Sequence, residues 1–303
     1  MKKTGIMPYE WMVKYTPEVE WIKGQGMLLW LAFFFSEIGA GIYFVSLFVN
    51  FRLGLLVGWL VTLVLGGLIH VAYLGKPMRS WRIFLRPSTS ELSRGLWVIL
   101  AYAALGFFQV LPLVFSGLPW TGESAALKII MGIICVLLIM HGFMMMSVVR
   151  AIPFWNSSMM VPLSVVSGLW VGSQAVLLMM FLAGLDINGV ELWARWSLLA
   201  LIGLLAMYLW GAAHSSETAK ASLQRLMMGG ASVSSYLAVM GLGILIAFVI
   251  TLMAWTEGTE SLGGGLIFVR FICVLIGDLI MRHSIMSSGL YTPLIPRRSP
   301  QKL

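Results

Sequence analysis

Four histidines, His70, His141, His214 and His283, lie within or at the ends of long apolar stretches of this 303-residue sequence. An imidazole exchanges protons near neutral pH, donates hydrogen bonds and ligates metals. Two such rings on facing helices are the axial ligands of a b-type haem, whereas a quinone headgroup needs hydrogen-bond donors and a source of two protons. The four histidines therefore predict a haem site or a quinone site, and their spacing fits both.

Three charged side chains lie deeper in the apolar stretches: Glu37, Asp278 and Arg282. A charge inside a bilayer is costly unless it is paired or hydrated, so such residues indicate function by default. Asp278 and Arg282 are four residues apart, which puts them on one helix face where they can neutralise each other. Glu37, about 15 Å along its helix, has no such neighbour in "FFFSEIGAGIYF". We expect it to be a protonated acid, a member of a proton relay, or paired with Arg282 across helices.

Eight apolar stretches must position these groups, and each has about the 20 residues that cross the hydrocarbon core of a bilayer. Hydrophobic residues make up 59% of the chain and charged residues 11%, so we predict an all-α polytopic membrane protein. The predicted spans are 27–51, 54–73, 95–116, 127–149, 159–184, 192–213, 233–255 and 265–290. A polar segment, 1–26, precedes this membrane domain of residues 27–290, and a basic tail, 291–303, follows it.

Most of the positive charge lies on one predicted side of the membrane. All but four of the 20 Lys and Arg residues lie in the terminal segments or in or near the loops after even-numbered spans. The exceptions are Arg52, Lys128, Arg195 and Arg270. The positive-inside rule then predicts a bacterial or archaeal inner-membrane protein with both termini cytoplasmic. The net charge of +8 is thus a topology signal, and we expect no nucleic-acid partner.

The loop from His70 to Gly95 holds an unusual concentration of cations. Its basic and aromatic residues include Lys76, Arg79, Trp81, Arg82 and Arg86. Such a loop is a topology determinant or a docking surface for an acidic partner. The two cysteines, Cys135 and Cys273, lie inside predicted helices without the paired spacing of metal ligands. We therefore expect no metal site and no iron–sulfur cluster in this chain.

Four elements of the sequence together resemble the NrfD-like membrane subunits of polysulfide-reductase-type respiratory complexes. In chain order they are "FFFSEIGAGIYFVSLF", "HVAYLGKPMRSWRIFLRPSTSELSRG", "IPFWNSSMMVPLSVVSGLWVG" and "GDLIMRHSIMSSGLY". The second is the most specific, and the likeness runs from about Gly24 to Pro296. The resemblance implies eight helices in two four-helix bundles, no haem, and a menaquinone or ubiquinone site near the leaflet where an iron–sulfur subunit docks. A catalytic subunit, with molybdopterin type as one option, completes such a complex.

The resemblance also assigns roles to residues of this chain. His141 stands where family members usually carry a tyrosine before "PFWN", so we expect His141 and His70 to contact the quinone headgroup, with Gln25 as a neighbour. The residues expected to extend a proton route inward are Glu37, Asp278, Arg282 and His283. The iron–sulfur subunit is expected to dock on Lys76, Arg79, Trp81, Arg82 and Arg86. Because the catalytic partners of some relatives are exported, the family leaves open which side the basic face takes.

Two other classes of function fit the same residues. An ion or proton transporter would use the buried charges, and interrupted helices in matching positions would indicate it. A structural anchor would hold an extrinsic enzyme at the membrane without redox chemistry. Gln109 and Gln174 either line a hydrated proton route or bond a neighbouring helix. The substrate of any such complex belongs to another subunit.

Overall fold

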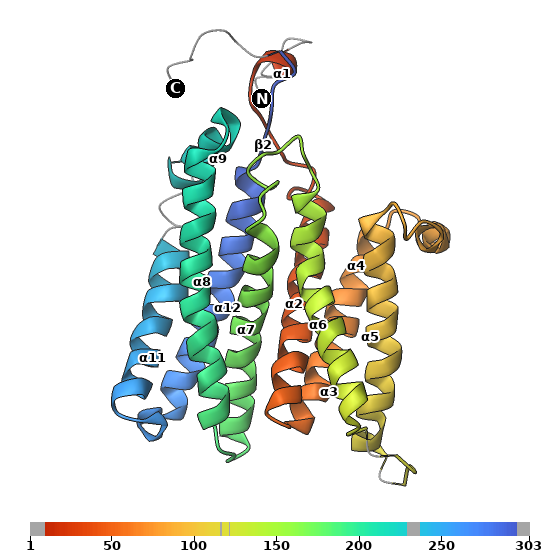
Figure 1. Ribbon diagram of the computed structural model, residues 1–303, viewed down its shortest axis with the longest axis vertical. Coiled ribbons are helices and arrows are strands. Elements are labelled where there is room, and N and C mark those ends of the chain that lie inside the picture. The colour runs from red at the N-terminus through yellow and green to blue at the C-terminus, as the bar shows by residue number, and fades with distance from the viewer. Residues whose placement is uncertain (1–9, 116, 121, 229–236, 296–303) are drawn as a thin grey trace.

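The computed structural model describes residues 10–115, 117–120, 122–228 and 237–295, which form a set of roughly parallel helices (Figure 1). Seven helical segments are long and apolar enough to cross a membrane. They are Gly26–Phe48, Arg52–Tyr73, Glu91–Val114, Ala125–Ser147, Met160–Leu182, Asn188–His214 and Gly264–Ser288. The fold class is therefore all-α, as predicted, with seven candidate membrane spans in the described residues.

Six of these spans are single helices. They are α2 (Gly26–Phe48), α5 (Glu91–Val114), α6 (Ala125–Ser147), α7 (Met160–Leu182), α8 (Asn188–His214) and α12 (Gly264–Ser288). The second span has three parts: α3 (Arg52–Leu60), a π-helical turn η1 (Val61–Gly67) and α4 (Leu68–Tyr73). The remaining predicted span, 233–255, corresponds to π-helical η3 (Leu237–Ile246) and α11 (Ala247–Thr256). Residues 233–236 of that prediction lie outside the described part of the chain.

Short helices also form in the segments between the spans. A 3-10 helix, η2 (Pro77–Leu85), follows α4, and α9 (Glu217–Met228) follows α8. A further 3-10 turn, η4 (Thr259–Ser261), precedes α12, and α1 (Glu10–Val13) precedes the first span. The prediction of membrane spans did not include any of these four helices, because none contains a long apolar run.

Helix α2 lies at the centre of the molecule and packs against α6, α7 and the α3–η1 segment (Figure 1). Two buried hydrophobic clusters share it: one joins α2 with α3, α5 and α6, and the other joins it with α7, α8, α11 and α12. Glycines allow close backbone contact, since a Cβ added at Gly41 would lie 2.1 Å from the carbonyl oxygen of Gly168. Such contacts between small residues are the usual basis of tight packing between membrane helices.

The two ends of the described chain meet on one face of the molecule. Strand β1 (Thr16–Pro17) pairs antiparallel with β2 (Leu290–Tyr291), directly after α12. The buried Glu18 accepts a hydrogen bond from the Tyr291 hydroxyl, and burial together with this contact raises the pKa of Tyr291 to about 12. The segments before the first span and after the last therefore lie on the same side, as predicted. Lys2, Lys3, Arg297, Arg298 and Lys302, which contribute to the predicted charge bias, lie outside the described residues.

Candidate functional site

A buried ion cluster joins α2, α7 and α12. The guanidinium of Arg282 donates hydrogen bonds to Glu37, to Asp278 (Nε to Oδ2, 2.7 Å) and to Ser167 (Nη2 to Oγ, 2.7 Å). The Ser167 hydroxyl in turn donates to the second carboxylate oxygen of Asp278. All four side chains are buried. The expected pairing of Asp278 with Arg282 along one helix and of Glu37 with Arg282 across helices is thus present.

The cluster contains more acid than base. Two carboxylates, Glu37 and Asp278, share one guanidinium, so the cluster has one excess negative charge unless a proton is bound. Oε1 of Glu37 has no hydrogen-bond partner within the described residues, whereas both oxygens of Asp278 are bonded. A buried polar atom without a partner is costly. Glu37 is therefore the carboxylate at which a proton would be exchanged most readily.

Two of the predicted histidines lie close to this cluster, around the ring of Phe33. Phe33 precedes Glu37 by one turn of α2, and its ring centroid lies 5.3 Å from that of His70 and 6.1 Å from that of His141. His70 Nδ1 lies 3.0 Å from the carbonyl oxygen of Gly66. In the described part of the chain, neither ring nitrogen of His141 forms a hydrogen bond. The imidazole of His141 instead lies against the backbone of Gly95 at the start of α5.

A single glycine connects the histidine pair with the ion cluster. Gly142 follows His141 on α6, and a Cβ added there would lie 2.3 Å from Oε1 of Glu37 and 3.1 Å from Cβ of Phe33. The unpartnered oxygen of Glu37 therefore points at the backbone next to His141. We call the set Phe33, His70, His141, Gly142 and Glu37 the His–Glu site.

The other two histidines lie apart from this site. His283 follows Arg282, but its ring contacts Trp30, with centroids 5.5 Å apart, and it is half-buried. His214 is exposed at the end of α8, where it stacks on Trp210 of its own helix at 4.2 Å. The four histidines therefore do not form one site: two join the His–Glu site, His283 contacts Trp30, and His214 faces outward.

The remaining predicted site residues are Gln25 and the five residues of the cationic loop. Gln25 is exposed and precedes the first residue of α2, about 12 Å from Phe33 by helical rise. The loop residues Lys76, Arg79, Trp81, Arg82 and Arg86 are exposed on or beside η2. None of these six residues contacts the His–Glu site in the described structure.

Sequence reasoning missed several groups that the fold brings to the cluster. Ser167 carries no charge, yet it links Arg282 to Asp278. The guanidinium carbon of Arg282 also lies 5.2 Å from the ring centroid of Phe143 on α6. No sequence signal singled out this serine. The spacing of Phe143 from His141 likewise gave no indication of a cation contact.

A second buried ion pair joins α8 and α12. Arg270, one of the four cations predicted to lie on the less basic side, is fully buried and forms two hydrogen bonds with Glu191, at 2.7 and 3.1 Å. It also donates to Oγ1 of Thr251 (3.3 Å). Its position near the start of α12 is on the predicted side. The sequence did not indicate its burial, because closeness to a helix end does not reveal which way a side chain points.

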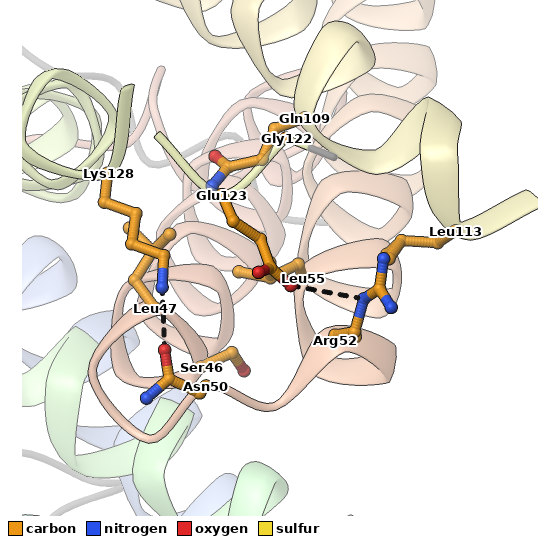
Figure 2. A pocket seen from close by; sticks show the side chains of 10 residues that line it. All are labelled: Ser46, Leu47, Asn50, Arg52, Leu55, Gln109, Leu113, Gly122, Glu123 and Lys128. Carbon is orange, nitrogen blue, oxygen red and sulfur yellow. Dashed lines mark hydrogen bonds and ion pairs between the residues drawn. The ribbon is translucent and has the colours of Figure 1, made fainter. Parts of the chain in front are cut away.

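A small polar pocket of about 30 Å³ lies at the membrane face opposite β1 and β2. Figure 2 shows Lys128 pointing to Asn50, with Nζ 2.7 Å from Oδ1, and Glu123 pointing to Arg52 at 4.0 Å. Gln109 lines the pocket and accepts a hydrogen bond from the Tyr43 hydroxyl at 2.7 Å. Gln109 thus bonds a neighbouring helix, one of its two predicted roles.

The fold and these buried charges define a polytopic, helical membrane protein with an ionisable cluster in its interior. Among the described residues, no group of three or more His, Cys, Asp and Glu side chains is placed to hold a metal ion. A scan against protein-family models and a search of curated proteins find no match for this chain.

Proposed function

We propose that this chain is a quinone-reactive, haem-free membrane subunit of a multisubunit respiratory oxidoreductase, of the NrfD-like type that its sequence resembles. In this proposal its eight spans form two four-helix bundles, with α2 at their junction. An iron–sulfur subunit docks at the cationic face, and a separate catalytic subunit acts on the substrate. The observation that supports the proposal best is the contact of His70 and His141 with one aromatic ring beside the buried acid Glu37.

The residue types fit the requirements of quinone chemistry. Reduction of a quinone to a quinol takes up two electrons and two protons, and the electrons would arrive singly from the iron–sulfur partner. The imidazoles of His141 and His70 can donate hydrogen bonds to a quinone carbonyl and pass on protons at neutral pH. Glu37 can hold a proton next to them, because Arg282 is already neutralised by Asp278. Asp278, Arg282 and His283 would extend this proton route, and Gln25 would lie at its outer edge.

The same geometry favours menaquinone or ubiquinone over a b-type haem. A haem with two histidine ligands needs both imidazoles to face one iron across the plane of the macrocycle. In this structure the ring of Phe33 contacts both imidazoles, and the backbone of Gly95 covers one side of His141. An absorption spectrum of the purified chain is a direct check, since a bound haem gives an intense Soret band.

Replacing His141 by Ala in the assembled complex tests the proposal. We expect quinone reduction to fall about 100-fold, as for loss of a general acid or base, while the iron–sulfur subunit stays bound. His214→Ala is the matched control, because His214 is also at the end of a span but is exposed and stacks on Trp210 of its own helix. Normal quinone reduction by an assembled His141→Ala complex would contradict the assignment. It would favour a structural anchor if bound quinone were also absent.

Proton translocation is a second candidate, and the unpartnered oxygen of Glu37 favours it. A charge cluster at the junction of two helix bundles is where a transporter would exchange a proton. Proteoliposomes that contain the chain alone separate the two candidates. A proton flux driven by a potassium gradient and lost in Glu37→Gln would support translocation, whereas quinone binding without flux supports the redox function.

A further inference from the structure

The 3-10 helix η2 lies beside the upper end of α5, at the outer edge of the molecule (Figure 1). It connects the end of α4 at Tyr73 with the start of α5 at Glu91, so it lies at the level where two spans end. Among the described residues, its one aromatic contact to the bundle is through Phe84, whose ring lies 5.6 Å from that of Trp97. The Trp97 indole also donates to the carbonyl oxygen of Phe84 (3.3 Å). Trp97 is itself half exposed on the outward side of α5.

One side of η2 is apolar, and two of its three large side chains are exposed. Residues three apart align along a 3-10 helix, so Met78, Trp81 and Phe84 share a side. Met78 is 89% exposed and Trp81 57%, although both continue the side on which Phe84 packs against Trp97. Large apolar side chains at this exposure are unusual on a surface in water. At the level of a helix end, beside an outward-facing tryptophan, their natural surroundings are the interfacial region of a bilayer.

An adjacent side of η2 is cationic. Arg79 and Arg82 are three residues apart and so align, and Lys76 and Arg86 flank the helix. The only acid in the loop, Glu91, is bonded to Arg94 (2.5 Å). Within the described residues, no carboxylate pairs with Arg79, Arg82, Arg86 or Lys76. Arg82 instead lies over the ring of Trp81, with its guanidinium carbon 5.7 Å from the ring centroid.

We propose that η2 is a membrane-surface helix whose cations bind the phosphate groups of anionic phospholipids while Met78 and Trp81 enter the lipid interface. A helix with one basic and one apolar side is the usual form of such an element, and basic residues next to a span attract anionic headgroups. From the sequence, this loop is a topology determinant or a docking surface, and the family resemblance favours docking of a protein partner. Its position beside α5 favours lipid, because the face above the bundle ends is formed instead by β1, β2 and α9. The inference depends on a membrane location and is independent of the quinone proposal.

A depth measurement on the full chain tests the apolar half of this proposal. A nitroxide is attached at Met78→Cys, in a Cys273→Ser background, and the protein is placed in lipid nanodiscs; the matched control is Ser88→Cys in the same loop. We expect the label at position 78 to collide more often with oxygen than with a soluble nickel complex, and the label at 88 to do the opposite. Equal accessibility at the two positions would overturn the proposal.

Charge reversal tests the lipid specificity. We compare Arg79→Glu/Arg82→Glu with Arg150→Glu/Arg225→Glu, which makes the same charge change at exposed sites just after α6 and on α9. The readout is the affinity for phosphatidylglycerol relative to phosphatidylcholine, measured by lipid titration in detergent. Each cation near an anionic surface contributes about fivefold, and the two Arg→Glu changes both remove a cation and add an anion, so we expect binding to weaken by at least about 25-fold in the first variant only.

Two results would contradict this inference. An equal loss in both variants would show that only the overall field of the face matters. Unchanged lipid affinity together with release of a copurifying iron–sulfur subunit from the Arg79→Glu/Arg82→Glu variant would identify η2 as a protein-docking surface. In each case His141→Ala still reports separately on the quinone proposal, because that variant leaves η2 intact.

Discussion

Two buried clusters, one toward each end of α12, both pair an arginine with carboxylates, but they differ in charge balance. Near the start of the helix, Arg270 and Glu191 form a balanced pair. The two terminal nitrogens of Arg270, Nη1 and Nη2, each donate a hydrogen bond to one carboxylate oxygen of Glu191. Toward the other end, Arg282 faces two acids, Glu37 and Asp278. The first cluster has equal numbers of positive and negative groups, whereas the second has one acid too many.

The two clusters also differ in which helices surround them. Glu191 and Arg270 connect α8 to α12, and Thr251 of α11 supplies a further acceptor, so that cluster lies among the helices of one hydrophobic core. Glu37 lies on α2, which is shared by both cores, and it points toward the backbone beside His141. A balanced pair within one core fits a structural role. An unbalanced cluster at a junction, next to protonatable rings, fits proton exchange.

The largest effect on stability is expected from breaking the balanced pair. Glu191→Gln removes the charge that neutralises Arg270, a side chain with no exposed surface. Removal of one partner of a buried ion pair costs about 3–5 kcal/mol, so we expect the free energy of unfolding to fall by that amount. Detergent-induced unfolding followed by circular dichroism measures it.

The double variant Glu191→Gln/Arg270→Gln is the control for this prediction. It removes both charges, so we expect it to recover most of the lost stability. A loss below about 1 kcal/mol in the single variant would mean that the pair is not buried in the membrane-embedded protein, because exposed pairs are worth that little. The contrast between the two clusters would then disappear.

The boundaries of the membrane spans were the part of the fold that the sequence predicted best. For the seven long spans, the predicted ends differ from the observed ones by at most four residues, as for 95 against Glu91 and 192 against Asn188. This works because each span needs a continuous apolar run, which a linear reading detects. The short helices η2 and α9 have no such run, and their formation depends on the segments that flank them.

The residues of the candidate site could be predicted from the sequence only in part. The pairing of Asp278 with Arg282 follows from a four-residue spacing, but Glu37 and Arg282 are 245 residues apart, and only the tertiary fold brings them together. The histidines show the same limit. A membrane span is apolar on its lipid-facing side and on its buried side, so its composition says little about which side is buried. Only the family resemblance separated His141 from His214 before the fold was known.

An intermediate effect is expected from crowding Glu37. In Gly142→Ala, the new methyl group would lie 2.3 Å from Oε1 of Glu37, so the carboxylate or α6 must move. Overpacking of this kind costs about 1–3 kcal/mol, and the displaced acid should also slow quinone reduction. Gly203→Ala is the control, since nothing lies within 4 Å of an added methyl group there. Equal stability of the two variants would show that Glu37 is not held against α6.

The smallest effect on stability is expected from removing Glu37, the excess acid of the second cluster. Glu37→Gln leaves Arg282 and Asp278 as a balanced pair, and the amide oxygen can still accept the hydrogen bond from Arg282. We therefore expect the free energy of unfolding to change by no more than about 1 kcal/mol, the net value of an ordinary hydrogen bond. Detergent unfolding of Glu37→Gln beside Glu191→Gln provides this comparison directly.

If Glu37 exchanges protons, Glu37→Gln should reduce quinone reduction strongly even though it changes stability little. An amide cannot bind and release a proton at neutral pH, so quinone reduction by the Glu37→Gln complex should fall about 100-fold although its stability is preserved. In Glu191→Gln the opposite is expected: lower stability, with normal turnover in the fraction that remains folded. If Glu37→Gln were as destabilising as Glu191→Gln and turned over normally, both clusters would be structural, and the excess acid would have no function in proton exchange.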